Sequence, residues 1–204
     1  MDELLILAKD LGLRVGSHSK KEGISEPLIA EVKAYSFADG SLWRESLKNQ
    51  THAVVLALDH LQDPQNLGAL CRTAEGLGVA GVLIPKDRSV GITAGAYHAS
   101  VGAIETIPIL QVTNLNEALR KLKENDFWVV GAALENSAKP LQDMPTFNKI
   151  VLVLGTELEG LKPSTVTTCD WLVHIPLKGK VDSLNVSAAG AILMHALLSR
   201  FEKS

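Results

Sequence analysis

Cysteine is scarce in this chain of 204 residues, which contains only Cys71 and Cys169. Two cysteines so far apart do not provide the dense cross-links of a small secreted domain, so we expect reduced thiols and a cytoplasmic protein. Long apolar runs are also missing, since none approaches the roughly 18 residues of a membrane span. The first residues, Met1-Asp-Glu-Leu-Leu, are acidic where a secretion signal requires basic residues. We therefore expect neither a membrane protein nor a secreted one.

An excess of basic charge is absent as well. The formal net charge is −3 and the isoelectric point is near 6.1, which argues against a chain coated with basic residues for nucleic acid. Local patches are still compatible with this balance, because Lys86 and Arg88 follow one predicted strand and Lys178 and Lys180 follow another. Neither pair is diagnostic alone, since solvated loops also carry such pairs.

Three common catalytic signatures are missing. The six histidines show neither H-x-x-x-H nor H-E-x-x-H spacing, so we expect no metal. Without G-x-S-x-G or a Walker A sequence, a hydrolase nucleophile elbow and NTP hydrolysis are not supported. Gly76-Leu-Gly-Val-Ala-Gly81 does spell G-x-G-x-x-G, but it ends a predicted helix and precedes a strand, the reverse of a dinucleotide loop. We interpret these glycines as a helix stop and a place of close packing.

The chain is a soluble globular type by composition, with 46% hydrophobic and 21% charged residues. Residues 2–11 have helical spacing, 15–26 are small and polar like a linker, and 28–32 suit a short strand. We expect a short N-terminal helix and linker over 1–26, which is too little to fold as a domain and is compatible with the tail of something longer, and one main domain over 27–204.

Strands and helices alternate regularly through the main domain. Apolar runs predict strands at 53–58, 79–84, 107–110, 127–132, 149–154 and 171–175. Helical spacing predicts helices at 42–47, 67–77, 92–101, 115–122 and 184–202. This order is typical of an α/β fold with a mostly parallel sheet. Because the strand at 149–154 is apolar on both faces, we expect helices on both faces of the sheet.

Polar stretches follow three of these strands. After the first, Asn66 can cap a helix, and Gly68 and Arg72 lie farther along it. After the strand at 149–154 comes Leu154-Gly155-Thr156-Glu157-Leu-Glu-Gly160-Leu. Ligands in open α/β sheets bind beyond the carboxyl ends of strands, although each stretch alone fits an ordinary helix cap or turn equally well.

The third stretch is Ile175-Pro-Leu-Lys-Gly-Lys-Val-Asp-Ser-Leu-Asn-Val-Ser-Ala-Ala-Gly190. Pro176 stops the preceding strand because it has no N–H to donate, and Gly179 gives the loop backbone freedom. Ser183 or Asn185 can then cap the last helix. A strand, a polar loop and a helix N-terminus together form a natural pocket for a polar ligand.

Taken in order, the three stretches resemble the SpoU/TrmH family of RNA ribose 2′-O-methyltransferases, over about residues 27–202. Pro85-Lys-Asp-Arg-Ser and the general layout look most like its bacterial 23S rRNA guanosine branch. The resemblance implies a deep C-terminal trefoil knot, an obligate homodimer, no membrane association, and an RNA substrate, rRNA rather than tRNA. It also implies bound S-adenosylmethionine. Residues 27–204 would then be a SpoU-type methyltransferase domain, and residues 1–26 stand where many relatives carry an RNA-binding domain, of which they would be a remnant.

The same resemblance assigns residues to roles. Cofactor contacts map to Ala132, Leu154, Gly155, Ile175, Leu177 and Leu184. Arg72 is assigned to the acceptor hydroxyl, either as a base or as a stabiliser of the alkoxide and the adjacent phosphate. Asn66, Ser183 and Asn185 are expected to orient the arginine and the ribose, and Glu157 to fix the second loop or to pair with Arg72. Leu158 departs from the small residue that relatives often have. Three alternatives stay open: a catalytically inert RNA-binding relative, a dehydrogenase built on residues 76–81, and a nucleotide-binding regulator.

Overall fold

The computed structural model describes residues 34–135, 137–156 and 159–201. The predicted helix at 2–11, the linker at 15–26, the strand at 28–32 and the proposed boundary between 26 and 27 therefore lie outside the described residues. So do Glu157 and Leu158. Residues 37–204 form one unit, which carries all of the elements below.

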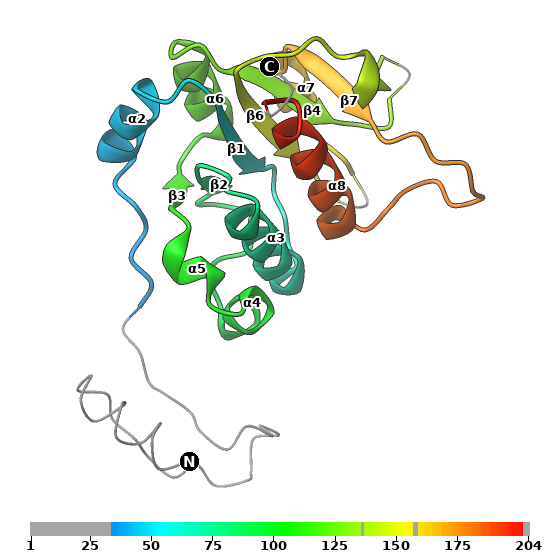
Figure 1. Ribbon diagram of the computed structural model, residues 1–204. Helices are drawn as coiled ribbons and strands as arrows, with labels where there is room; N and C mark the ends of the chain where they lie inside the picture. The colour runs from blue at the N-terminus through cyan, green and yellow to red at the C-terminus, as the bar shows by residue number, and fades with distance from the viewer. Residues whose placement is uncertain (1–33, 136, 157–158, 202–204) are drawn as a thin grey trace, which may run out of the picture. The chain divides into compact units, whose positions relative to one another are not determined.

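Seven parallel strands form a single sheet in the order β3-β2-β1-β6-β4-β7-β5 (Figure 1). The strands are β1 (Ala53–Leu58), β2 (Val82–Pro85), β3 (Ile109–Val112), β4 (Trp128–Ala132), β5 (Lys139–Pro140), β6 (Lys149–Leu154) and β7 (Trp171–His174). The parallel sheet predicted from the sequence is thus confirmed. The order is not sequential, because β6 lies between β1 and β4.

Helices connect the strands, and a short 3-10 turn, η2 (Leu141–Asp143), precedes β6. The α-helices are α2 (Gly40–Lys48), α3 (Pro64–Gly76), α4 (Ala94–Ser100), α5 (Ala103–Thr106), α6 (Leu115–Lys123), α7 (Pro163–Thr168) and α8 (Val186–Leu198). None of these described helices is long and apolar enough to cross a membrane.

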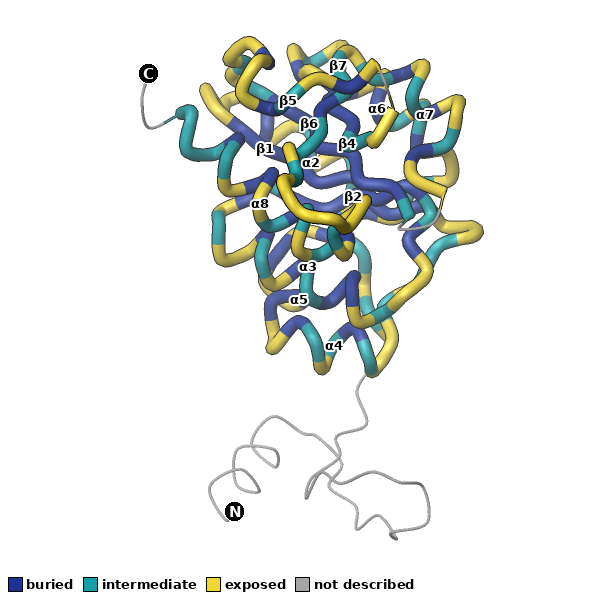
Figure 2. Tube along the Cα trace, turned by 90° about the vertical axis from the view of Figure 1, so that its right-hand side faces the viewer, coloured by how far each residue is buried: buried dark blue, intermediate teal, exposed yellow. Residues whose placement is uncertain are grey.

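The core explains why the central strands are so apolar. Every residue of β1 is buried, as are the last five of β6 (Figure 2). Val55, Ala57 and Val153 pack in one cluster with side chains of α2 and α6, whereas α3 and α8 lie together against the opposite face. Helices therefore cover both faces, as the unalternating strands predicted.

Strand register brings the strand ends to one edge. β1 and β6 pair residue for residue from Ala53 with Lys149 to Leu58 with Leu154, so both end at the same level. β4 and β7 join the same edge, with Ala132 opposite Val173. The loops after β4, β6 and β7 consequently meet at this edge of the sheet.

Several predicted helix limits were wrong. α3 begins at Pro64, because the Asp63 carboxylate caps it by accepting the Gln65 N–H at 2.9 Å. Asn66 therefore lies inside the helix and is not its cap. The predicted helix at 92–101 corresponds to α4, which begins at Ala94 and ends at Ser100; the structure adds α5 after Val101 and Gly102, which are in the left-handed conformation at φ 50° and 88°.

Asn185, and not Ser183, caps the last helix: its Oδ1 accepts the Ser187 N–H at 2.9 Å, and α8 begins at Val186. Asn114 caps α6, because its side chain accepts the Glu117 N–H. The glycine run at 76–81 lies where it was predicted, between the end of α3 and the start of β2, and a side chain at Gly81 would meet the Trp43 indole at 2.7 Å. No helix begins there, so the run lacks the setting of a dinucleotide loop.

Candidate active site

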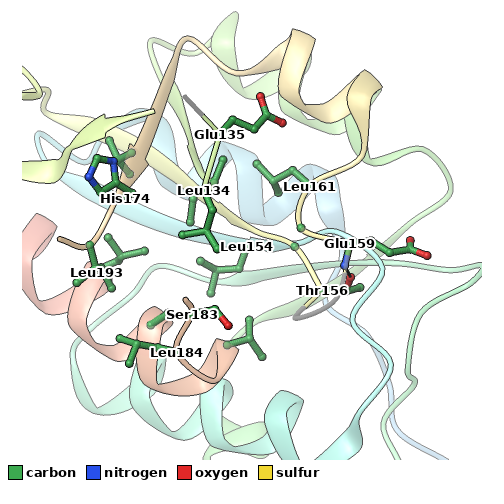
Figure 3. A pocket seen from close by; sticks show the side chains of 18 of the residues that line it. Leu134, Glu135, Leu154, Thr156, Glu159, Leu161, His174, Ser183, Leu184 and Leu193 are labelled. Carbon is green, nitrogen blue, oxygen red and sulfur yellow. Dashed lines mark hydrogen bonds between the residues drawn. The ribbon is translucent and has the colours of Figure 1, made fainter. Parts of the chain in front are cut away.

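A cavity of about 410 Å³ lies at the carboxyl edge of β4, β6 and β7 (Figure 3). It is lined by Ala132, Ala133, Leu134, Glu135, Leu154, Gly155, Thr156, Glu159, Gly160, Leu161, Val173, His174, Ile175, Leu177, Ser183, Leu184, Val186, Ala189 and Leu193. Its volume lies within the usual range of small-molecule sites. Three strand ends, the three loops that follow them and the first turns of α8 thus build one cavity within one chain.

The residues predicted to contact a cofactor all line this cavity: Ala132, Leu154, Gly155, Ile175, Leu177 and Leu184. They come from three segments that are distant in the sequence. Ser183, predicted for the acceptor side, also lines it (Figure 3). The structure thus brings the second and third polar stretches together, as the sequence predicted.

The loop after β6 is folded tightly on itself. Thr156 and Gly160 exchange two backbone hydrogen bonds of 3.1 and 3.0 Å, and the Thr156 hydroxyl accepts the Glu159 N–H. A side chain at Gly155 would overlap the Gly160 carbonyl, and Gly160 has φ 65°. Both glycines are therefore required, one for space and one for backbone conformation.

Helix α8 forms the opposite wall. Val186, Ala189 and Leu193 face the cavity at helical spacing. On another side of the helix, a side chain at Gly190 would overlap Leu70 of α3 and would approach Leu154 at 2.8 Å. This glycine lets α8 lie close to both α3 and the end of β6, which fixes the position of the wall.

The cavity is mainly apolar, and its charged side chains are acidic. Leucines form much of its lining, and its polar side chains include Glu135, Glu159 and His174. Of the lining residues that the structure describes, none is a lysine or an arginine. Because a phosphate group is usually bound by such cations, this lining favours an uncharged or cationic ligand.

Asn66 and Asn185 lie together beside the cavity. The Asn185 amide donates to Asn66 Oδ1 at 3.1 Å, which joins the first turn of α3 to the cap of α8. Asn66 is only 8% exposed although it is polar. The first polar stretch is thereby connected to the third, residue by residue.

Arg72 does not line the cavity. It is exposed on α3, six residues or about 9 Å along the helix axis from Asn66. Among the described residues its side chain has neither a hydrogen-bond partner nor an ion-pair partner. Glu157, which was predicted to accompany it, is outside the described residues. One chain therefore does not bring Arg72 to the cavity.

Several lining residues were not predicted from the sequence. They include Leu134, Glu135, Thr156, Glu159 and His174, which are labelled in Figure 3. A usable signal existed for most of them, because each directly follows or ends a predicted strand. The Glu159 carboxylate points away from the centre of the cavity in this view.

Neither cysteine is suited to nucleophilic chemistry. Burial raises the pKa of the Cys71 thiol to about 12. Burial, and secondarily the charge of Asp170, raises the pKa of Cys169 to about 12 as well. Because the thiolate is the reactive form, both thiols are inert near neutral pH. Within the described residues, moreover, no group of three or more His, Cys, Asp or Glu side chains could hold a metal ion.

Comparison with known proteins decides the family. Residues 53–195 match the model of the SpoU rRNA Methylase family. The chain belongs to this family. A protein of Staphylococcus saprophyticus is 37% identical over 207 residues, which cover 98% of this chain and 83% of the relative. Its name is "Putative TrmH family tRNA/rRNA methyltransferase".

Solved structures agree with the SpoU fold. An rRNA methyltransferase from Sinorhizobium meliloti, crystallised with AdoMet bound, has a TM-score of 0.75 and 24% identity, covering 98% of this chain and 85% of that one. An RNA 2′-O ribose methyltransferase has a TM-score of 0.68 and 23% identity, covering 86% and 65%. The α/β fold with its parallel sheet is thus the fold of SpoU methyltransferases.

Proposed function

We propose that this protein transfers a methyl group from S-adenosylmethionine to a ribose 2′-hydroxyl of RNA, and of rRNA rather than tRNA, in the cytoplasm. One observation carries the proposal. Gly155, Ile175 and Leu184, which come from two separate stretches, line a single cavity at the carboxyl edge of the sheet. Family membership gives the reaction class, and the related RNA 2′-O ribose methyltransferase supports the ribose hydroxyl as the acceptor.

The cavity suits S-adenosylmethionine in size and in charge. Its apolar walls, Leu154, Leu161 and Leu184 among them, can enclose an adenine. The acidic residue Glu135 at the cavity rim is compatible with a ligand that carries sulfonium and ammonium charges. When bound, this cofactor supplies an electrophilic methyl group on sulfur.

Arg72 is the residue that we assign to the acceptor. A guanidinium stays protonated at physiological pH, so it is a poor base. It is well suited to bind the phosphate next to the acceptor ribose and to stabilise the oxygen as its proton is lost. Asn66, Ser183 and Asn185 orient the ribose or the guanidinium by hydrogen bonds, and Glu157 pairs with Arg72 or fixes its own loop.

A homodimer would supply what one chain lacks. Arg72 lies outside the cavity of its own chain, so we propose that it serves the cavity of a second copy. Ile192 supports this arrangement, since it is 46% exposed on α8, a helix whose other positions are mostly apolar. The exposed part of α8 is then the natural contact between the two copies.

We also propose that the chain carries the trefoil knot of the family, formed around the loop at 175–185. The strand order is compatible with it, because β6 is inserted between the earlier strands β1 and β4, and β7 pairs on the far side of β4. A knot of this kind would hold the loop rigidly against the cavity that it lines.

Two measurements test the function. Titration calorimetry with S-adenosylhomocysteine should show binding to the purified protein. Methyl transfer to total rRNA and tRNA from cells that lack the protein, followed by mass-spectrometric mapping, should place new methyl groups on ribose, at rRNA positions. Binding without transfer to any RNA would favour a catalytically inert relative, and methylation of bases would contradict the proposed acceptor.

A further inference from the structure

Asp59 is a buried carboxylate at the carboxyl end of β1. It is 1% exposed, and it is the one Asp or Glu among the buried polar residues of the described chain. Within the part of the chain that the structure describes, no lysine or arginine side chain pairs with the Asp59 carboxylate. A buried carboxylate is costly unless hydrogen bonds compensate it, so its partners indicate what it is for.

Those partners lie at the two ends of the loop that closes the cavity. The Asp59 N–H donates to the Leu154 carbonyl at 2.7 Å, just before the loop begins. Asp59 Oδ2 accepts the Lys162 N–H at 2.9 Å, just after the loop ends. The residues on either side of 155–161 are therefore both hydrogen-bonded to Asp59, which directly follows β1.

The second carboxylate oxygen is occupied by the next residue in the chain. His60 has φ 63°, and its ring Nδ1 contacts Asp59 Oδ1. Gln62 donates to the carbonyls of His60 and Arg88, at 3.1 and 2.8 Å, which ties this turn to the loop after β2. Both carboxylate oxygens of Asp59 thus have partners, and the turn that carries Asp59 is fixed to the loop after β2.

We propose that Asp59 is a positioning residue for the cofactor: it fixes both ends of the loop at 155–161 and thereby sets the shape of the cavity. The inference rests on the proposed function for the identity of the ligand. Asp59 is not among the residues that line the cavity, so it acts through the loop and does not touch the cofactor.

Removing either member of the Asp59–Lys162 hydrogen bond tests the proposal. Asp59→Ala removes the acceptor. Lys162→Pro removes the donor, and its φ of −63° suits proline. We expect each to weaken S-adenosylhomocysteine binding about 10- to 100-fold, as expected for a broken buried hydrogen bond. The double variant should be no weaker than the weaker single variant, because both remove one interaction.

Kinetics distinguish positioning from catalysis. In Asp59→Ala, KM for S-adenosylmethionine should rise about as much as the dissociation constant, whereas kcat at saturating cofactor should change less than about threefold. Asp59→Asn should recover most of the affinity, since its amide oxygen still accepts from Lys162 and its amide group can donate to a neutral His60 ring.

Asp170 provides the matched control. Its carboxylate also accepts a backbone N–H, that of Val129 at 2.9 Å, and it pairs with Lys123, but it lies at the amino end of β4. Asp170→Ala should lower stability without changing cofactor affinity, and Lys162→Ala, which keeps the N–H, should bind normally. Equal losses of affinity in Asp59→Ala and Asp170→Ala would overturn the proposal, as would normal binding by Lys162→Pro.

Hydrogen exchange separates this proposal from the proposed function. In the unliganded protein, amides of 155–161 should exchange faster in Asp59→Ala and Lys162→Pro than in the wild type or in Asp170→Ala. If the wild type bound no S-adenosylhomocysteine, the function would fail while this exchange pattern still showed that Asp59 holds the loop. Unchanged exchange in the two variants would contradict the role of Asp59 whatever the ligand.

Discussion

The cavity and the polar residues beside it differ in how completely one chain builds them. The cavity is lined by three strand ends, three loops and α8, and Gly155 in its wall leaves no room for a side chain. Beside it, Asn66 and Asn185 are joined, whereas Arg72 is exposed and about 9 Å farther along α3. Under the proposed function, the single chain would build the cofactor cavity, while the arginine assigned to the acceptor, Arg72, lies outside it. The two tasks should therefore be separable by mutation.

Arg72→Ala should give the largest separation. We expect methyl transfer to fall about 10³-fold, the cost of losing a donor to developing negative charge, while S-adenosylhomocysteine binding stays within about twofold of the wild type. Arg120→Ala, which removes a surface arginine from the last turn of α6, is the matched control and should leave both unchanged. Near-normal turnover in Arg72→Ala would refute the assigned role.

Gly155→Ala should have the opposite effect, because it should weaken cofactor binding by distorting the cavity wall. The added methyl group would overlap the Gly160 carbonyl, so the turn must open. Calorimetry should show cofactor affinity reduced about 100-fold, since overpacking of this kind costs about 1–3 kcal/mol. Gly76→Ala, where an added methyl group meets nothing within 4 Å, should bind normally. Wild-type affinity in Gly155→Ala would mean that the turn is not a fixed wall.

Ile192→Asp tests whether a second copy completes the site. A charge on this exposed apolar position of α8 should weaken dimerisation about 10- to 100-fold, as for a central interface residue, and reduce methyl transfer with it. Light scattering across a concentration series measures the first effect. Leu42→Asp, at a position that is 74% exposed on α2, is the control and should change neither. A wild-type protein that stays monomeric and active would disprove the dimer.

The smallest expected effect is on the pH dependence of stability, through the buried Cys71 thiol of α3. The pKa of Cys71 is raised to about 12 from 9.0, so its contribution to stability is present in full below pH 9 and is lost as the pH rises toward 12. At pH 10 the loss should be on the order of 1 kcal/mol. Urea unfolding at pH 7 and pH 10 should show a smaller pH dependence in Cys71→Ala. An identical dependence in both proteins would contradict this assignment.

The sequence predicted those parts of the fold that rest on apolar patterns. β1 and β6 were predicted with the limits that the structure has, because their residues are apolar on both faces. The structure adds α7, whose sequence Pro-Ser-Thr-Val-Thr-Thr has neither apolar spacing nor strong helix formers. β5 has only two residues and is visible only through its pairing with β7.

The cofactor residues Gly155, Ile175 and Leu184 were assigned through the resemblance to the SpoU/TrmH family, and the structure places all three around one cavity. For Gly155 and Ile175 the topology gives the physical reason, because residues that directly follow parallel strands reach one edge of the sheet. Asn66 was wrongly predicted as a cap, because Asp63 and Pro64 form a better helix start. Asp59 carried no local signal, since its importance depends on Lys162, which is 103 residues away.

Gly190 lies at the contact between α8, which lines the cavity, and α3, which carries Arg72. It seats α8 on α3, so the helix that lines the cavity and the helix that carries Arg72 share one tightly packed joint. Any tilt imposed on α8 by a second copy of the chain must then move the ligand wall and the arginine helix together. Dimerisation and ligand binding should consequently be coupled. The protein concentration at which dimers form should shift when S-adenosylhomocysteine is added, with no RNA present.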